Sequence, residues 1–143
     1  MSSSQVVATA ADRDFLVQAL RLTLVPGVGP RLRQSLLAHF STADAVLSAA
    51  PSELRKVPGI GAKISQAIAR ANDTIDAEAE IELCRQQGIQ ILIDPHPPYP
   101  PALREIHDPP GVLFVLGSLL PSDELAVAIV GSRHATQYGL ATA

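Results

Sequence analysis

The sequence predicts two parts of different fold class: an N-terminal α-helical domain, followed by the start of an α/β domain with a parallel sheet. Helical spacing of apolar residues, interrupted twice by the same glycine-rich break, fills the first half. Short apolar runs of the kind found in strands replace it after Gly88. The net charge also changes sign between the two halves, which favours two structural units.

The composition is that of a globular protein, with 47% hydrophobic and 17% charged residues. The first 12 residues carry neither a basic segment nor a long apolar core, so they are predicted to be a disordered tail rather than a signal peptide. No apolar run approaches the ~20 residues of a membrane-spanning helix, and no membrane partner is expected. The single cysteine, Cys84, is predicted to be a small buried hydrophobe and fits a reducing, cytoplasmic location.

The charges are segregated along the chain. Residues 13–72 hold eight basic and three acidic side chains, a net charge of +5. Residues 73–108 hold two basic and eight acidic side chains, a net charge of −6. A basic unit followed by an acidic one suggests that the first unit meets an anionic partner.

The glycine-rich break is part of an internal repeat. The run VPGVGPRL, starting at Val25, aligns without gaps with VPGIGAKI, starting at Val57, at an offset of 32 residues. Each copy predicts a helix, a tight turn and a second helix. Glycines are expected to supply positive φ and close approach, and Val28 or Ile60 is expected to plug the core. Each copy then has a helix N-terminus followed by a basic residue, which is the local chemistry of a phosphate cradle. The predicted phosphate-binding residues of the repeat are Gly27, Gly29, Arg31, Gly59, Gly61 and Lys63.

This pattern closely resembles the helix-hairpin-helix DNA-binding motif, present in duplicate in a SAM-like helical domain over residues 13–72. A pseudo-two-fold pair of such hairpins can hold a nucleic-acid backbone without reading bases. Doubled hairpins also serve as helical scaffolds or protein-docking sites, and that alternative stays open at this point.

Further helices are expected after Ser41 or Thr42, and from Pro51. Residues 73–88 are then predicted to form one acidic linking helix that ends at Gly88, a natural residue after a helix C-terminus. Its expected apolar face is formed by Ile75, Ala79, Leu83 and Cys84.

From residue 89 the apolar period changes. Strands are predicted over 89–93 and 112–116, separated by a proline-rich loop with at most one short helix. A third apolar run, 126–130, has the appearance of a strand buried on both faces of a parallel sheet. Thr136 can cap a helix beginning near Gln137. A buried strand needs neighbours on both sides, so the chain is expected to be a piece of a longer protein.

The turn after the third run is the second candidate phosphate site. It consists of Gly131, Ser132 and Arg133, and its backbone amides would face an anion at a helix N-terminus. The dinucleotide motif G-x-G-x-x-G is not matched, because Arg133 stands where its second glycine belongs. The alternative is a simple strand-to-helix turn with a solvated arginine.

No catalytic residue, metal site or cofactor is predicted. The four histidines lack metal-ligand spacing, and motifs such as G-x-S-x-G or a Walker loop do not occur. His96 and His107 lie near Asp94 and Asp108 in proline-rich loops, and surface polar groups are favoured there over an acid–base pair.

Three features occur together: the doubled hairpin, the segment from Tyr99 to Gly117 (YPxxLxxIxDPPxxLFxxG), and the run VAIVGSRxxTxYG from Val127 to Gly139. In combination they resemble the DNA-processing protein A family, also called DprA or Smf, the recombination mediators of bacterial natural transformation. The resemblance implies that residues 89–143 are the truncated start of a Rossmann-like domain. It also implies single-stranded DNA binding that protects incoming DNA, loading of RecA recombinase, a homodimer, and no enzymatic activity. In that family the Gly-Ser-Arg turn, here Gly131, Ser132 and Arg133, borders the phosphate site.

Two alternatives to this function remain. One is a Rossmann-type enzyme that processes nucleotides, similar to the lysine-decarboxylase-like phosphoribohydrolases, which would need a second glycine-rich loop and a catalytic carboxylate beyond Ala143. The other is a helical scaffold whose hairpins dock protein. The downstream sequence would test the first, and a DNA titration would test the second.

Overall fold

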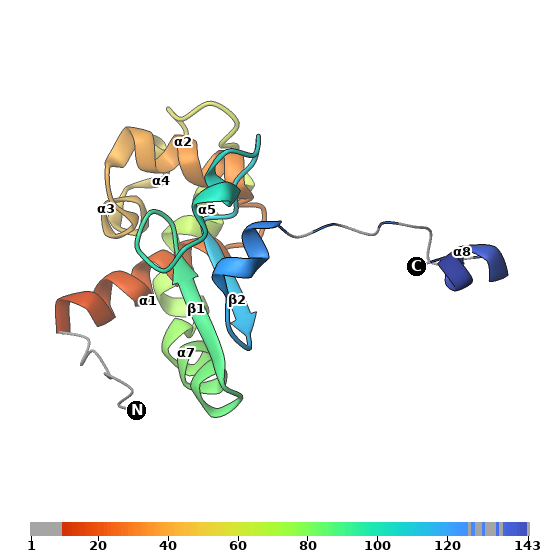
Figure 1. The fold of residues 1–143 in the computed structure, drawn as a ribbon. Helices are drawn as coiled ribbons and strands as arrows, with labels where there is room; N and C mark the ends of the chain where they lie inside the picture. Colours follow the sequence, from red (N-terminus) through yellow and green to blue (C-terminus); the bar gives the residue numbers. More distant parts are fainter. Residues whose placement is uncertain (1–9, 126, 128–129, 131–133, 135, 143) are drawn as a thin grey trace.

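The structure, a computed structural model, describes residues 10–125, 127, 130, 134 and 136–142. The predicted N-terminal tail lies mostly outside this range, and the first helix already begins at Ala10. The helical part is built from six helices (Figure 1): α1 (Ala10–Leu24), α2 (Pro30–Phe40), α3 (Ala43–Ser48), α4 (Pro51–Leu54), α5 (Ala62–Ala69) and α6 (Ala71–Thr74).

The ends of these helices follow local chemistry. Of the two predicted caps, Ser41 and Thr42, it is Thr42 that is the N-cap of α3, where its hydroxyl accepts a hydrogen bond of 3.1 Å from the Ala45 amide. Proline occupies the first turn of α2 and of α4, where its missing N–H leaves no helical hydrogen bond unmade. The helices enclose one apolar cluster in which Leu36 and Ile68 are completely buried. Val28 and Ile60 belong to this cluster, so the predicted plugs are confirmed.

Helix α1 serves two cores. Leu22, near its C-terminal end, packs into the cluster of the helical part. Val17 and Leu20 belong instead to a second cluster, together with Ile93 and Val112 from the sheet. Figure 1 shows α1 running between the helices α2 to α5 and the strands. The helical part is therefore joined to the rest of the chain through a shared helix rather than a flexible linker.

The predicted single helix over 73–88 is wrong. Helix α6 ends at Thr74, Ile75 is extended, and α7 (Ala77–Gln86) starts afresh. The carboxylate of Asp76 causes this restart, because it accepts a hydrogen bond of 2.9 Å from the Ala79 amide as an N-cap. Gly88 follows the helix with φ +68°, as its predicted position requires.

The restart also changes which face of α7 is buried. Ala77 and Cys84 are buried and Ile81 is partly buried, which is an i, i+4, i+7 stripe. The predicted face is wrong at Ala79 and Leu83, which are exposed. The prediction that Cys84 is a buried hydrophobe is confirmed, with 3% of its surface exposed.

Strands β1 (Ile89–Ile93) and β2 (Val112–Leu116) have the predicted bounds and pair in register, Ile89 opposite Leu116 and Ile93 opposite Val112. The pair is antiparallel, whereas a parallel sheet was expected. The loop 94–111 returns the chain without a crossover helix and contains only the short 3₁₀ helix η1 (Pro101–Arg104). The loop is closed by hydrogen bonds from Tyr99 Oη to the Pro110 carbonyl (2.6 Å) and from the Asp94 amide to the Gly111 carbonyl (3.1 Å).

A 3₁₀ helix, η2 (Pro121–Leu125), follows β2. The predicted third strand at 126–130 lies largely outside the described residues. The helix expected near Gln137 is present as α8 (Gln137–Thr142). The predicted cap is also confirmed, because Thr136 Oγ1 accepts a hydrogen bond of 3.1 Å from the Gly139 amide.

Candidate nucleic-acid interface

The repeat forms two turns with the same backbone. We call residues 25–30 with α2 hairpin 1, and residues 57–62 with α5 hairpin 2. In each turn the first residue accepts a hydrogen bond from the fourth, Val28 N to Val25 O (3.0 Å) and Ile60 N to Val57 O (3.1 Å). The third residue of each turn is a glycine at positive φ, +90° at Gly27. This is the pattern of a type II turn with proline in second place.

The two hairpins pack against each other reciprocally. A Cβ on Gly27 would lie 3.4 Å from Ile64 in α5, and one on Gly59 would lie 2.8 Å from Leu32 in α2. Ile64 is the repeat counterpart of Leu32, so each glycine faces the equivalent residue of the other copy. The hairpins are thus related by a pseudo-two-fold relationship.

The second glycine of each copy has a different role from the one expected. Gly29 and Gly61 are the N-caps of α2 and α5, with φ of −83° and −88°, so the expected positive φ is wrong for both. Nothing lies within 4 Å of a Cβ at either position. Both N-caps therefore leave room for a partner beside the first turn of the helix, where backbone amides have no partner within the helix.

The basic residues that follow the caps differ in their surroundings. Lys63 is exposed on α5 and has no ion-pair partner among the residues that the structure describes. Arg31 is also exposed, but its Nε lies 3.7 Å from Asp108 Oδ1 in the loop before β2. His107 Nε2 lies 4.0 Å from the same oxygen. The two predicted cations are therefore not equivalent: an anion would compete with Asp108 for Arg31 but not for Lys63.

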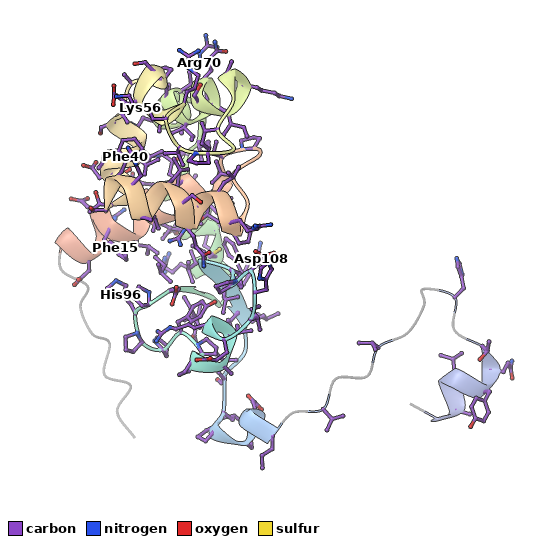
Figure 2. The ribbon with its side chains drawn as sticks, turned by 90° about the horizontal axis from the view of Figure 1, so that it is seen from above. Phe15, Phe40, Lys56, Arg70, His96 and Asp108 are labelled. Atoms are coloured by element: carbon purple, nitrogen blue, oxygen red, sulfur yellow. The ribbon has the colours of Figure 1, made fainter. Side chains whose placement is uncertain are left out.

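Other basic side chains of the positive segment are held by intramolecular contacts. Arg21 donates to the Ile75 carbonyl and to Asn72, which ties α1 to α6. Lys56 Nζ lies 2.7 Å from Glu53. Arg70 is exposed, and Figure 2 shows it with Lys56 at the end of the helical part farthest from His96 and Asp108. Arg21 and Lys56 are thus already engaged within the fold, whereas Arg70 is exposed.

Arg33 is a buried cation that sequence reasoning did not single out. It is 7% exposed, its Nε has no hydrogen-bond partner among the described residues, and its guanidinium packs against Gly111. Burial lowers the pKa of Arg33, and the nearby Asp94 and Tyr99 act against this shift. Its position inside a basic helical segment made it indistinguishable from a solvated arginine in the sequence.

The second candidate phosphate site, Gly131, Ser132 and Arg133, lies outside the described residues.

The histidines considered for acid–base work are exposed, and the ring of His96 contacts Phe15 edge to face at 4.7 Å. No group of three potential metal ligands occurs in the described part of the chain. Within that same part, no helix has the length and apolar character needed to cross a membrane.

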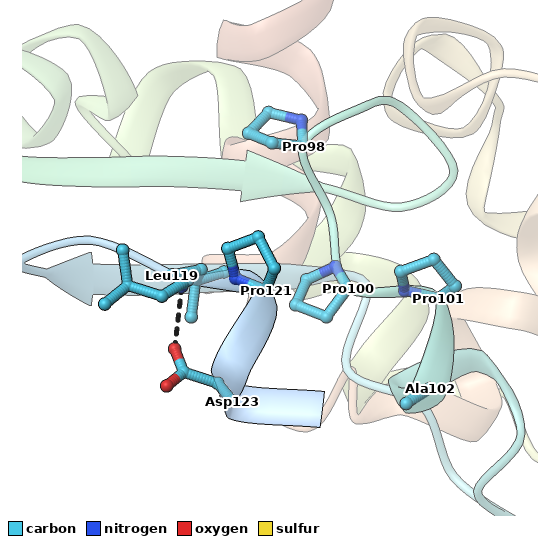
Figure 3. A pocket seen from close by; sticks show the side chains of 8 residues that line it. Pro98, Pro100, Pro101, Ala102, Leu119, Pro121 and Asp123 are labelled. Carbon is cyan, nitrogen blue, oxygen red and sulfur yellow. Dashed lines mark hydrogen bonds between the residues drawn. The ribbon is translucent and has the colours of Figure 1, made fainter. Parts of the chain in front are cut away.

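An apolar pocket of about 520 Å³ lies between the proline-rich loop and η2 (Figure 3). Asp123 is the charged residue of its lining, and it accepts a hydrogen bond of 2.7 Å from the Leu120 amide. A lining of prolines and leucines without a basic group does not suit a phosphate. It is formed by Pro98, Pro100, Pro101, Ala102, Leu119, Leu120, Pro121 and Asp123.

Comparison with known proteins gives matches to both halves of the chain. Residues 19–71 match the family model of the SAM-like helix-hairpin-helix tandem, and residues 90–143 match that of DNA recombination-mediator protein A. The chain is 34% identical over 119 residues to protein Smf of Synechocystis sp., an alignment that covers 80% of this chain and 30% of the relative.

A second relative is the DNA processing protein DprA of Bacillus subtilis, 43% identical over 56 residues, or 38% of this chain and 19% of the relative. The chain thus spans less than a third of the length of either relative. No solved structure gives a significant match. The order of the two family matches and the two named relatives place this chain in the DprA/Smf family of DNA-processing proteins.

Proposed function

We propose that the chain is part of a cytoplasmic single-stranded DNA-binding recombination mediator of natural transformation. The observation that carries this proposal is the turn of hairpin 2. Its N-cap Gly61 is open to approach, its helix presents unpaired first-turn amides, and Lys63 stands beside them without an acidic partner among the described residues. An open helix N-terminus with an adjacent cation suits a backbone phosphate and carries no base information.

Single-stranded DNA is preferred over duplex because of the family resemblance. The same resemblance is the basis for proposing RecA as a partner and a homodimer as the assembly, both for a protein of the relatives' length. Gly131, Ser132 and Arg133 are proposed to add a second phosphate contact, on the basis of their sequence pattern.

The proposal is tested by titrating fluorescently labelled oligo-dT with the chain at several salt concentrations. Because binding releases counterions, log K should fall with log salt at a slope near −0.7 for each phosphate contacted. Lys63→Gln should weaken binding and reduce the slope by about 0.7. Lys56→Gln is the matched control, since Lys56 is an exposed lysine of the same helical part that is already paired with Glu53. Affinity that ignores salt, or equal effects of both variants, would contradict the proposal.

A further inference from the structure

The 32-residue repeat allows each position of hairpin 1 to be compared with its counterpart in hairpin 2. The turns, the N-cap glycines and the buried Leu36 and Ile68 are equivalent. Three of the pairs that differ bear on the roles of the two hairpins: Pro30 and Ala62, Arg31 and Lys63, Arg33 and Ser65.

The first two differences weaken hairpin 1 as an anion site. Pro30 is the first residue of α2 and has no backbone N–H, whereas its counterpart Ala62 supplies one. The Nε of Arg31 lies 3.7 Å from the Asp108 carboxylate, so a phosphate would compete with a carboxylate of this chain for Arg31. Lys63 has no such acidic neighbour in the described part of the chain.

The third difference links hairpin 1 to the second half of the chain. The Ser65 hydroxyl donates to the Ala62 carbonyl at 3.0 Å and so stays within its own helix. Arg33, at the equivalent position, reaches across to Gly111, immediately before β2, and is buried there. A methyl group at Gly111 would overlap the Arg33 guanidinium, so the absence of a side chain at Gly111 creates the space that Arg33 fills.

We infer that the two hairpins have different roles. Hairpin 1 binds the loop 108–111, which belongs to the part of the chain that matches DNA recombination-mediator protein A (residues 90–143), through Arg31 and Arg33. Hairpin 2 alone contacts DNA. The hairpin 2 half of this inference rests on the proposed function. The hairpin 1 half rests on contacts within the chain. The contacts of Arg31 and Arg33 thereby hold the helical part in one orientation on the loop 108–111.

The first test compares the counterpart residues in the oligo-dT titration. Lys63→Gln is expected to reduce the salt slope by about 0.7, and Arg31→Gln is expected to leave it unchanged. Equal losses in the two variants would overturn the division of roles. A wild-type chain without salt-dependent affinity would overturn the proposed function instead, and the docking role of hairpin 1 would then be decided by the second test alone.

The second test needs no DNA. Gly111→Ala is expected to lower the melting temperature by about 3–8 °C, because the new methyl group displaces the Arg33 guanidinium. In an Arg33→Met background, where the guanidinium is absent, the same Gly111→Ala change should have almost no effect. This difference between backgrounds measures the coupling of the two residues directly. An equal loss in both backgrounds would overturn the docking contact between Arg33 and Gly111.

Discussion

Gly59 lies directly beneath Leu32: a Cβ on this glycine would be 2.8 Å from Leu32 Cδ2. Gly59 also has φ +88°, a backbone conformation that is unfavourable for any residue with a side chain. The turn of hairpin 2 therefore depends on glycine for two reasons, its backbone angle and its contact with hairpin 1. The repeat counterpart, Gly27, meets Ile64 at a looser 3.4 Å.

Gly59→Val should be among the most destabilising single changes in the helical part. The left-handed backbone alone costs a side-chain-bearing residue about 1–2 kcal/mol, and the clash with Leu32 adds to this. Gly61→Ala is the matched control, because Gly61 has an ordinary φ of −88° and open space in front of it. Chemical denaturation of both variants checks the prediction, and a Gly59→Val protein as stable as wild type would refute the hairpin geometry.

The helical part is predicted to fold on its own, since its apolar cluster is contributed by α1 to α6 and the turns between them. Leu36→Ala should then cost about 2–5 kcal/mol both in the full chain and in a shortened chain of residues 10–76. Leu20→Ala should cost a similar amount in the full chain but much less in the shortened one. Leu20 packs with Ala77, Ile93 and Val112, which the shortened chain lacks. Urea denaturation of the wild type and both variants in the two lengths, about six proteins in all, measures this. Absence of a cooperative transition in the shortened wild type would show that α1 needs both cores.

Tyr99 should make the protein sensitive to alkaline pH. Its pKa is raised above the ordinary value of 10.0, mainly by burial, and also by the nearby Asp94. Because the folded pKa is the higher one, the contribution of the neutral phenol is fully present below pH 10.0 and is lost as the pH rises through the folded pKa. Tyr99→Phe should remove this part of the alkaline loss.

At neutral pH the same variant should be less stable by about 0.5–1.5 kcal/mol, because the hydrogen bond to the Pro110 carbonyl is gone. Thermal melts between pH 7 and pH 11 measure both effects. Cys84, whose pKa burial also raises, is present in both proteins and cancels in the comparison. Tyr138→Phe, at a tyrosine that is 80% exposed, provides the control. If Tyr99→Phe lost as much stability at alkaline pH as the wild type, groups other than Tyr99 would be responsible for that loss.

Arg133 is predicted to be a principal phosphate ligand in a protein of the relatives' length. Arginine donates two parallel hydrogen bonds to phosphate oxygens, and ligands of open α/β sheets gather beyond the carboxyl ends of strands. Arg133→Ala should cost about 1.5–3 kcal/mol of binding, or roughly ten- to a hundredfold in affinity for oligo-dT. A variant that melts like wild type and binds oligo-dT with wild-type affinity would show that Arg133 is not a phosphate ligand.

Local features of the fold could be predicted because their causes are local. Proline followed by glycine specifies the two turns, Thr42 and Thr136 cap the helices that follow them, and both strands have the predicted bounds. Each of these signals acts between residues at most a few positions apart, through backbone angles or side-chain-to-amide hydrogen bonds. The repeat itself predicted the pseudo-two-fold pair, because the same local sequence folds in the same way twice.

By itself, then, the sequence determined the hairpins, their buried plugs and the family to which the chain belongs. Only the tertiary structure decided which of the repeated residues remain accessible. The pairing of Arg31 with Asp108 and the burial of Arg33 against Gly111 join residues about 77 or 78 positions apart, and no periodicity reports such a contact. The burial of Ala77 in place of Ala79 has the same origin, because the second core selects the face of α7 that it covers. Local sequence signals specify the helices, strands and turns, whereas the packing between them decides which basic side chains remain accessible to a partner.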